Sequence, residues 1–160
     1  MRFYLASSIE NIHNARYFIQ KLKEVGFEQT FDWTQNVVTG DFSEHQKDYK
    51  RAALQEFNGI DFCDIFIALL PGGRGTHTEL GIAIGMLKPI IIACLSSEDL
   101  NNENPCPLYY LPGVKLLCQP DIDSLAKATI SYLEEMWLCF TLQKQPISKN
   151  KTEDCYETDK

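Results

Sequence analysis

The sequence predicts an α/β fold in which a parallel β-sheet carries helices on both faces, and three observations support this prediction. Short apolar runs such as "DIFIALL" and "KPIIIACL" have the length and continuous apolar character of strands that are buried on both faces. Segments with apolar residues at helical spacing separate these runs. The chain has 160 residues, of which 44% are hydrophobic, so it is long enough for one domain with one core.

The N-terminal part of the chain predicts two strand–helix units. Residues 1–7, "MRFYLAS", form a short strand, and residues 8–26 follow as an amphipathic helix. Residues 27–34, "FEQTFDWT", form a second strand that ends in polar residues. After a loop, Ser43 caps a helix over residues 44–61, in which alanine, leucine and phenylalanine face inward. The apolar positions of the first helix are Ile9, Ile12, Ala15, Phe18, Ile19 and Leu22.

The remainder of the chain continues the alternation. Residues 64–70 form a buried strand, which Pro71 bounds, and a helix over residues 76–87 follows. Residues 88–95 form the next buried strand. A longer polar connection leads to a short strand, "VKLLC", and then to a final amphipathic helix over residues 121–142. The candidate N-caps of that helix are Asp121 and Asp123.

Strand and helix thus alternate about five times, with crossovers long enough for parallel strands. We expect a flavodoxin-like, doubly wound, five-stranded parallel sheet in one domain over residues 1–143, followed by a polar, disordered tail over residues 144–160. Ligands of such sheets bind outside the carboxyl ends of the strands, at the switch point of the strand order. This rule brings the loops after Tyr4, Asp32 and Leu70 around one crevice.

Composition excludes several classes of protein. The formal net charge is −7 and the lysines and arginines are scattered, so the chain lacks the basic stripe of a protein that binds DNA or RNA. Six cysteines show neither CxxC spacing nor a zinc-like cluster, and several lie in apolar runs, as reduced thiols do in a reducing cytosol. No secretory signal precedes "MRFYLASS", and no apolar run approaches the roughly 20 residues that span a bilayer. We therefore expect a cytoplasmic protein without a membrane partner.

The glycine-rich loop after the third predicted strand has the composition of an anion site. Gly72, Gly73 and Gly75 let the backbone turn tightly and approach a ligand, beside a helix start whose free N–H groups attract anions. Thr76 is the expected N-cap of that helix, and Glu79, three residues later, can complete a capping box.

A second interpretation gives Glu79 a ligand instead of a cap. The sequence "LGIAIGML" follows it, so its part of the helix carries small and apolar residues, as at the floor of a crevice. A carboxylate in a pocket at the switch point can act on a bound molecule. Both interpretations remain open at this stage.

Two common nucleotide motifs are absent from the sequence. No Gly-Lys-Ser/Thr follows the glycines, so the loop is not a Walker A loop, and no GxGxxG follows the first strand. Nucleoside triphosphate hydrolysis and dinucleotide redox chemistry are therefore disfavoured. No metal or redox cofactor is implied.

The segments "FNGIDFCDIFIALLP" and "GRGTHTELGIAIGMLKPIII" resemble the nucleoside 2-deoxyribosyltransferases and related enzymes that hydrolyse the N-glycosidic bond of nucleoside 5′-monophosphates. The resemblance covers most of residues 1–118 and is strongest at the acidic helix before the third strand, at "ELG" and at "FYLASS". The loop also resembles the P-G-G-x-G-T-x-x-E pattern of the Lonely Guy phosphoribohydrolases, although the earlier glycine cluster of that family is missing. Both families break the bond between a base and the sugar C1′.

The resemblance implies catalytic roles for three residues. It assigns the nucleophile to Glu79 and the tyrosine that orients this carboxylate to Tyr4. An acidic residue eight positions before Asp64 corresponds to Glu56, where the relatives carry an aspartate that contacts the base. A further aspartate of the transferases falls on Gly73, which is a departure from the family pattern.

The chemistry of glycosidic cleavage agrees with these roles. Breaking the bond creates an oxocarbenium-like sugar, which a carboxylate stabilises electrostatically or captures as a glycosyl ester. The departing base also needs a proton, which Glu56, His77 or a water held by Asp32 can supply. A lone histidine at a helix start can equally be a solvent-facing residue.

Several further residues are candidates for substrate binding. Ser7 and Ser8, with Arg74 and Thr76, can together bind a 5′-phosphate, and the guanidinium offers bidentate contacts to such a group. The serines can instead cap the first helix, and the arginine can be an exposed loop charge.

The aromatic residues also allow two interpretations. Trp33, which follows Asp32 at the end of the second predicted strand, can stack on a base or belong to the core. The segment "YYLPGV", residues 109–114, can cover a base or contact another subunit. The resemblance implies a homodimer or a larger homo-oligomer, because relatives complete their sites with residues of a neighbouring subunit. Trp137, Leu138 and Phe140 of the final helix fit an interface or plain core packing.

These observations lead to an enzyme that cleaves or transfers at the N-glycosidic bond of a nucleoside or nucleoside 5′-monophosphate. A second base as acceptor gives transfer and water gives hydrolysis, and Arg74 favours a phosphorylated substrate and hence hydrolysis. The alternatives are a nucleotide sensor of the same fold without catalysis and a protein-interaction module in which Glu79 is only a cap.

Overall fold

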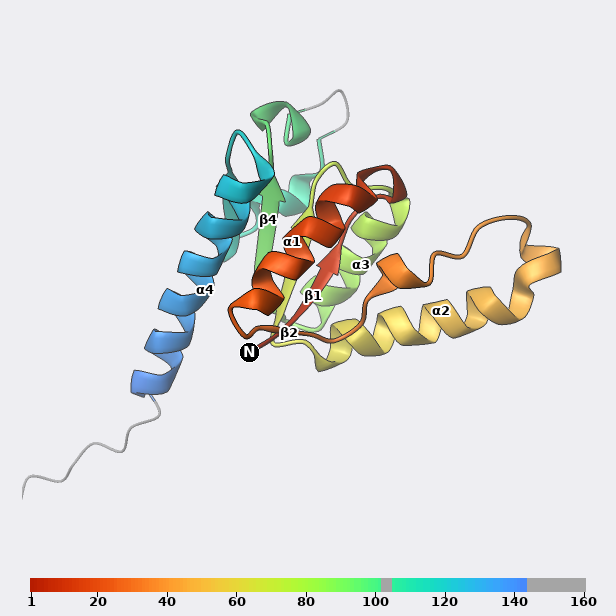
Figure 1. The fold of residues 1–160 in the computed structure, drawn as a ribbon, viewed down its shortest axis with the longest axis horizontal. Coiled ribbons are helices and arrows are strands. Elements are labelled where there is room, and N and C mark those ends of the chain that lie inside the picture. Colours follow the sequence, from red (N-terminus) through yellow and green to blue (C-terminus); the bar gives the residue numbers. More distant parts are fainter. Residues whose placement is uncertain (102–104, 144–160) are drawn as a thin grey trace, which may run out of the picture.

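The computed structural model describes residues 1–101 and 105–143, and its centre is one sheet of five parallel strands in the order β2-β1-β3-β4-β5 (Figure 1). Every neighbouring pair of strands is parallel. The predicted fold class and strand order are therefore confirmed. The strands are β1 (Arg2–Ala6), β2 (Glu28–Gln29), β3 (Ile65–Leu69), β4 (Ile90–Cys94) and β5 (Val114–Cys118).

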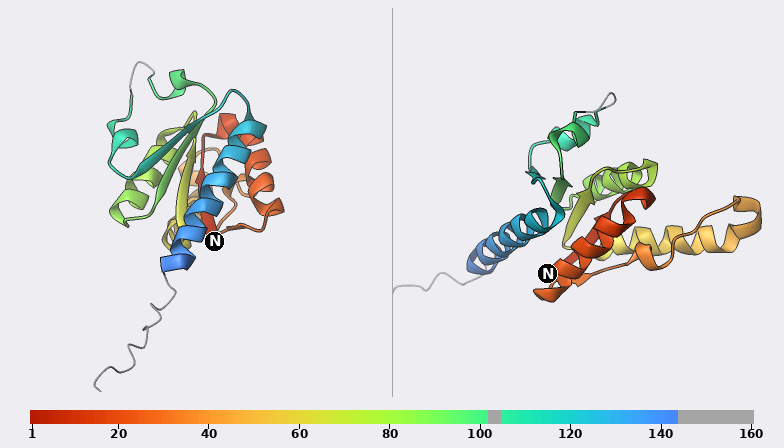
Figure 2. Two further views of the ribbon diagram at one scale, coloured as in Figure 1. Left: turned by 90° about the vertical axis from the view of Figure 1, so that its left-hand side faces the viewer. Right: turned by 45° about the horizontal axis from the view of Figure 1, so that its top comes forward.

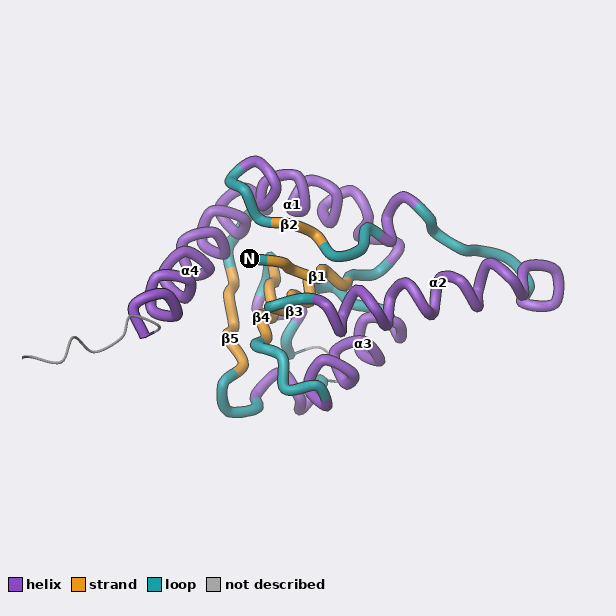
Figure 3. Tube along the Cα trace, turned by 90° about the horizontal axis from the view of Figure 1, so that it is seen from below, coloured by secondary structure: helices purple, strands orange, loops and turns teal. Residues whose placement is uncertain are grey.

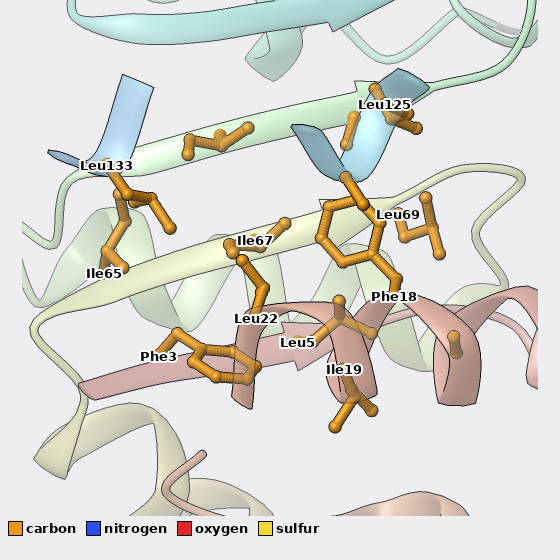
Figure 4. Packing of buried hydrophobic residues seen from close by; sticks show 14 of the residues in the cluster. Phe3, Leu5, Phe18, Ile19, Leu22, Ile65, Ile67, Leu69, Leu125 and Leu133 are labelled. Carbon is orange, nitrogen blue, oxygen red and sulfur yellow. The ribbon is translucent and has the colours of Figure 1, made fainter. Parts of the chain in front are cut away.

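Helices cover both faces of the sheet (Figure 3). Successive side chains of a strand point to opposite faces, so the strands supply two separate apolar clusters. One cluster joins the sheet to α1 (Ile12–Glu24) and α4 (Ile122–Gln143), and Figure 4 shows its side chains between these helices and the strands. The other joins the sheet to α2 (Phe42–Phe62) and α3 (Arg74–Gly85).

The central strands carry the core. All five residues of β3 and all five of β4 are buried, as the continuous apolar runs predicted. Four of the expected inward positions of the first helix, among them Phe18 and Leu22, are also buried. Ile9 is exposed instead, because it belongs to a separate 3-10 turn, Ile9–Asn11, that precedes α1.

The second strand is much shorter than predicted. The pairing of β2 with β1 ends at Gln29, and the Asp32 carboxylate then accepts hydrogen bonds from the Thr34 N–H and hydroxyl, which turn the chain into the 3-10 helix Trp33–Gln35. The expected cap at Ser43 is also wrong. Asp41 caps α2, since its carboxylate accepts from the Ser43 N–H.

Helix α2 extends beyond the sheet (Figure 2). The helix is kinked at His45, and its residues 46–62 span about 26 Å, whereas a five-residue strand spans about 17 Å, so the N-terminal part of α2 extends past the strands. Leu54 and Phe57, in the C-terminal half of α2, are 65% and 47% exposed, so the expectation that the apolar residues of this helix face inward is wrong for these two.

The final helix, α4, also carries exposed apolar residues, in its C-terminal half. Asp121 caps it, because its carboxylate accepts from the Ser124 N–H and hydroxyl. Trp137 and Leu138 are largely exposed, so they are not core residues of this subunit.

The predicted tail, residues 144–160, lies outside the described residues. Five cysteines of the described part are free thiols, and no helix there is long and apolar enough to cross a membrane.

Candidate active site

A pocket of about 590 Å³ opens at the carboxyl ends of β1 and β3, where the predicted switch point lies. Its walls come from the loop after β1, the segment 33–38, the middle of α2 and the start of α3. The predicted site residues that line it are Ser7, Trp33, Glu56, Gly73, Arg74, Gly75, Thr76 and Glu79.

Glu79 lies in the second turn of α3 and is held by Tyr4. The Tyr4 hydroxyl donates a hydrogen bond of 2.5 Å to Glu79 Oε1, and the tyrosine itself is fully buried in β1. The expected capping box at Thr76 and Glu79 is wrong. The N-cap of α3 is Gly73, whose N–H donates to Thr76 Oγ1 over 3.1 Å, so Glu79 is too far along the helix to cap it. Its carboxylate therefore faces the pocket.

The surroundings of Glu79 favour a protonated carboxyl. Burial raises its pKa to about 7, the hydrogen bond from Tyr4 acts in the opposite direction, and the nearby charge of Glu56 raises it further. Burial and the neighbouring Glu79 raise the pKa of Tyr4 far above its ordinary value, so the phenol remains a hydrogen-bond donor. Near pH 7 the pocket thus contains a carboxyl group that readily changes its protonation state.

Glu56 provides a second carboxyl group in the same pocket. It lies on α2, is about half buried, and has its pKa raised by that burial. Glycosidic cleavage uses two carboxyl groups in one crevice, a charged one as nucleophile and a protonated one as acid, and this pocket contains such a pair.

The start of α3 forms the anion-binding side of the pocket. The first helical hydrogen bond runs from the His77 N–H to the Gly73 carbonyl, so the N–H groups of Arg74, Gly75 and Thr76 have no helical acceptor. They lie at the positive end of the helix dipole. The Arg74 side chain forms no ion pair with a carboxylate of residues 1–101 and 105–143, and it lines the pocket.

The two serines after β1 differ in what their hydroxyls can do. Ser7 donates its proton to the Leu69 carbonyl and accepts from the Asn11 amide. Ser8 only accepts, from the Asn11 N–H, and is the N-cap of the 3-10 turn. Among the described residues the Ser8 proton has no acceptor, so Ser8 is the better donor to a ligand. The sequence had predicted both serines as candidates for binding a phosphate.

The opposite wall of the pocket is apolar. Trp33 is buried, donates from its indole N–H to the Leu5 carbonyl, and belongs both to the core and to the pocket wall. Val37 and Val38 continue this wall, and α2 contributes Ala52 on the facing side. A flat, apolar group such as a nucleobase fits this surrounding.

Comparison with known proteins agrees with this geometry. The family described as nucleoside 2-deoxyribosyltransferase matches residues 3–133. The chain belongs to the nucleoside 2-deoxyribosyltransferase family.

Solved structures share the fold of this family member. The CMP N-glycosidase BcmB of Clostridium botulinum is 22% identical with a TM-score of 0.56, over 81% of this chain and 98% of that one. BlsM is 16% identical with a TM-score of 0.58, over 92% of this chain and 96% of that one. A comparison with curated proteins gave no match.

Besides Tyr4, which reaches the pocket only through its hydrogen bond to Glu79, two residues predicted for the site of this nucleoside 2-deoxyribosyltransferase family member do not line the pocket. Asp32 uses its carboxylate to cap the 3-10 helix that starts at Trp33. His77 turns away from the pocket and contacts the Gly73 carbonyl and the Tyr109 hydroxyl. Neither is positioned in this structure to hand a proton to a molecule in the pocket.

Two supporting residues escaped the sequence analysis. A Cβ at Gly59 of α2 would lie 2.8 Å from Phe31 Cβ and 2.9 Å from the ring of Tyr4, so only glycine lets the helix close over the tyrosine. A glycine inside a predicted helix was the available signal, because it costs about 1 kcal/mol unless packing requires it. Asn11 is buried and ties Ser7 to the Leu70 carbonyl. Nothing in its local sequence marks that role.

Proposed function

We propose that this protein hydrolyses the N-glycosidic bond of a nucleoside 5′-monophosphate, with Glu79 as the nucleophile. One observation carries the proposal. A buried carboxylate that a tyrosine holds, Glu79 with Tyr4, shares a pocket with the unpaired N–H groups and the guanidinium at the start of α3. The first arrangement suits attack at C1′ and the second suits a phosphate.

The first step is displacement at the sugar. The Glu79 carboxylate forms a bond to C1′ while the bond from C1′ to the base nitrogen breaks, and the electron pair of that bond leaves with the base. Tyr4 supports this step, because its hydrogen bond to Oε1 orients the carboxylate and favours its charged form.

Glu56 is the proposed proton donor. It protonates the departing base, and as a carboxylate it then accepts a proton from the water that attacks C1′ of the glycosyl ester. The products are the free base and the sugar 5-phosphate, and both glutamates return to their starting states. Its raised pKa supports the first of these roles.

The proposed phosphate site consists of the N–H groups of Arg74 and Gly75, the Ser8 hydroxyl and the Arg74 guanidinium. Each is a donor without an acceptor in the described part of the chain, and phosphate offers only acceptors. Glu10 also lines this side of the pocket as an exposed carboxylate and would weaken binding of the dianion. BcmB, a CMP N-glycosidase of the same fold, acts on a nucleoside monophosphate, which is compatible with such a site.

We further propose that the protein assembles as a homo-oligomer. Phe57 and Leu54 are exposed on the part of α2 whose other residues line the pocket, and burial of such side chains is favourable. Size-exclusion chromatography with light scattering tests this proposal, and a monomer at micromolar concentration contradicts it.

The decisive experiment measures release of free base by chromatography from a panel of nucleosides and their 5′-monophosphates, with and without a second base. Release that is faster from the monophosphates than from the nucleosides and that disappears in Glu79→Gln supports the proposal. A new nucleoside in the presence of the second base identifies a transferase instead. Binding of a nucleotide without any release identifies a sensor and contradicts the enzyme.

A further inference from the structure

The connection between β4 and β5 reaches the start of α3 through one tyrosine. Its 3-10 helix, Pro107–Tyr110, carries Tyr109, which is only 4% exposed. The Tyr109 hydroxyl lies 2.6 Å from Nε2 of His77, and the two rings stack with their centroids 5.7 Å apart. Neither residue lines the pocket, and the proposed chemistry uses neither.

The other nitrogen of the imidazole holds the glycine loop. His77 Nδ1 lies 2.7 Å from the Gly73 carbonyl oxygen. A carbonyl only accepts, so Nδ1 carries a proton, and in the tautomer with its proton on Nδ1 the Nε2 atom accepts from the Tyr109 hydroxyl. The donors and acceptors therefore run in one direction, from Tyr109 through His77 to Gly73.

The Gly73 carbonyl shares a peptide plane with the N–H of Arg74. In a trans peptide these two groups point in opposite directions, and the plane rotates as a unit. A hydrogen bond that fixes the carbonyl on the side of His77 thereby directs the Arg74 N–H to the opposite side of this peptide, and both residues of the peptide line the pocket. The His77 N–H donates to the same carbonyl over 3.2 Å, so the histidine holds it at two points.

We infer that Tyr109 is a positioning residue for phosphate, which acts through His77 to aim the backbone N–H groups at the start of α3. The inference rests on the proposed function for its ligand, a phosphate monoester. It makes the β4–β5 connection part of substrate binding, although none of the described residues of that connection, 95–101 and 105–113, lines the pocket.

Removal of one hydroxyl tests the inference. In Tyr109→Phe we expect KM for the nucleoside 5′-monophosphate to rise about fivefold, the effect of one neutral hydrogen bond, with kcat changed less than twofold. Cleavage of the unphosphorylated nucleoside should stay unchanged. The matched control is Tyr110→Phe, which removes the neighbouring hydroxyl from a side chain that is 53% exposed and donates to Asn101 Oδ1. Equal effects of both variants, or a loss of kcat alone, overturn the inference.

A double variant separates positioning from general stability. In a His77→Phe background, Tyr109→Phe should change KM no further, because the connection to Gly73 is already broken. Additive effects of the two substitutions contradict an action through His77.

A measurement without turnover keeps the inference testable if the proposed hydrolysis fails. In ¹⁵N spectra of the full chain titrated with inorganic phosphate, the Arg74 and Gly75 amide signals should respond in the wild type and at several-fold higher phosphate in Tyr109→Phe. If the Arg74 and Gly75 amide signals of Tyr109→Phe have their wild-type positions and respond at the wild-type phosphate concentration, the positioning role is overturned. If the phosphate response is as expected but no turnover occurs, only the proposed hydrolysis is contradicted and the positioning role stands.

Discussion

The floor and the rim of the pocket are built on different physical principles. The floor consists of Tyr4 and Glu79 beneath a closely packed helix, where burial sets the protonation of one carboxyl. The rim consists of backbone N–H groups and the exposed Arg74, which offer charge and hydrogen bonds in contact with water. We therefore expect changes at the floor to alter kcat and its pH dependence, and changes at the rim to alter KM.

The largest effect is expected for Glu79→Gln. This variant removes the proposed nucleophile but keeps the shape of the side chain, so kcat should fall by about a thousandfold or more while KM changes little. Steady-state assays of base release measure both constants. A variant that retains a tenth of the activity contradicts the nucleophilic role.

Glu79→Gln should also be more stable than the wild type at high pH. The folded-state pKa of Glu79 is raised from 4.5 to about 7, so the wild type loses stability as the pH rises from 4.5 to 7 and the buried carboxyl ionises. Glutamine avoids this loss, which is roughly 3 kcal/mol at pH 8 and absent at pH 4. Urea unfolding at both pH values measures the difference.

Arg74→Met should act on the rim alone. It keeps the aliphatic stem and removes the charge, so KM for a nucleoside 5′-monophosphate should rise about 10- to 100-fold, the usual effect of losing hydrogen bonds between charged groups. Arg51→Met is the matched control, because Arg51 is an exposed arginine of α2 that pairs with Asp48. An equal loss for the unphosphorylated nucleoside would show that Arg74 does not bind the phosphate.

Gly59→Ala should disturb the floor from outside the pocket. The new methyl group would lie within 3 Å of the Tyr4 ring and Phe31, so we expect a loss of about 2 kcal/mol in the free energy of unfolding and about a tenfold fall in kcat. Gly81→Ala places the same methyl group on α3 in open space and should stabilise the helix slightly. Thermal unfolding and assays of both variants test the contrast, and equal behaviour contradicts it.

Tyr4→Phe gives the smallest and most specific effect. Its hydroxyl lowers the pKa of Glu79, so its removal should raise that pKa further and move the rise of kcat/KM with pH to higher pH. Below pH 7 the activity should fall several-fold. Tyr17→Phe removes a surface hydroxyl and serves as the control for the pH profile. An unchanged profile in Tyr4→Phe would show that the hydrogen bond does not tune the carboxyl.

The sequence alone predicted the strands of the sheet and most of the floor of the site. Continuous apolar runs identify β3 and β4, because strands buried on both faces need apolar residues at every position. Glu79 and Tyr4 were found through a family resemblance, since nothing in local sequence indicates that residues 75 positions apart share a hydrogen bond.

The parts that sequence could not predict depend on contacts between distant segments. The start of α3 was misplaced at Thr76, because a glycine N-cap leaves no side-chain signal, whereas a threonine imitates one. Asp32 was expected at the site, but its carboxylate binds its own 3-10 helix, an alternative that local hydrogen bonding always offers aspartate. The direction of the His77 ring depends on Tyr109, which lies 32 positions away.

The part of α2 that extends beyond the sheet, its overhang, contributes to the pocket but not to the buried core. Tyr49 and Ala53 of that overhang line the pocket, yet no buried core residue of the described chain lies on α2 before Gly59. Substitutions there can reshape the space for the base at little cost in the free energy of unfolding. Under the proposed function, the preference for one base can therefore be changed on α2 while Tyr4 of β1 and Glu79 of α3 keep their geometry.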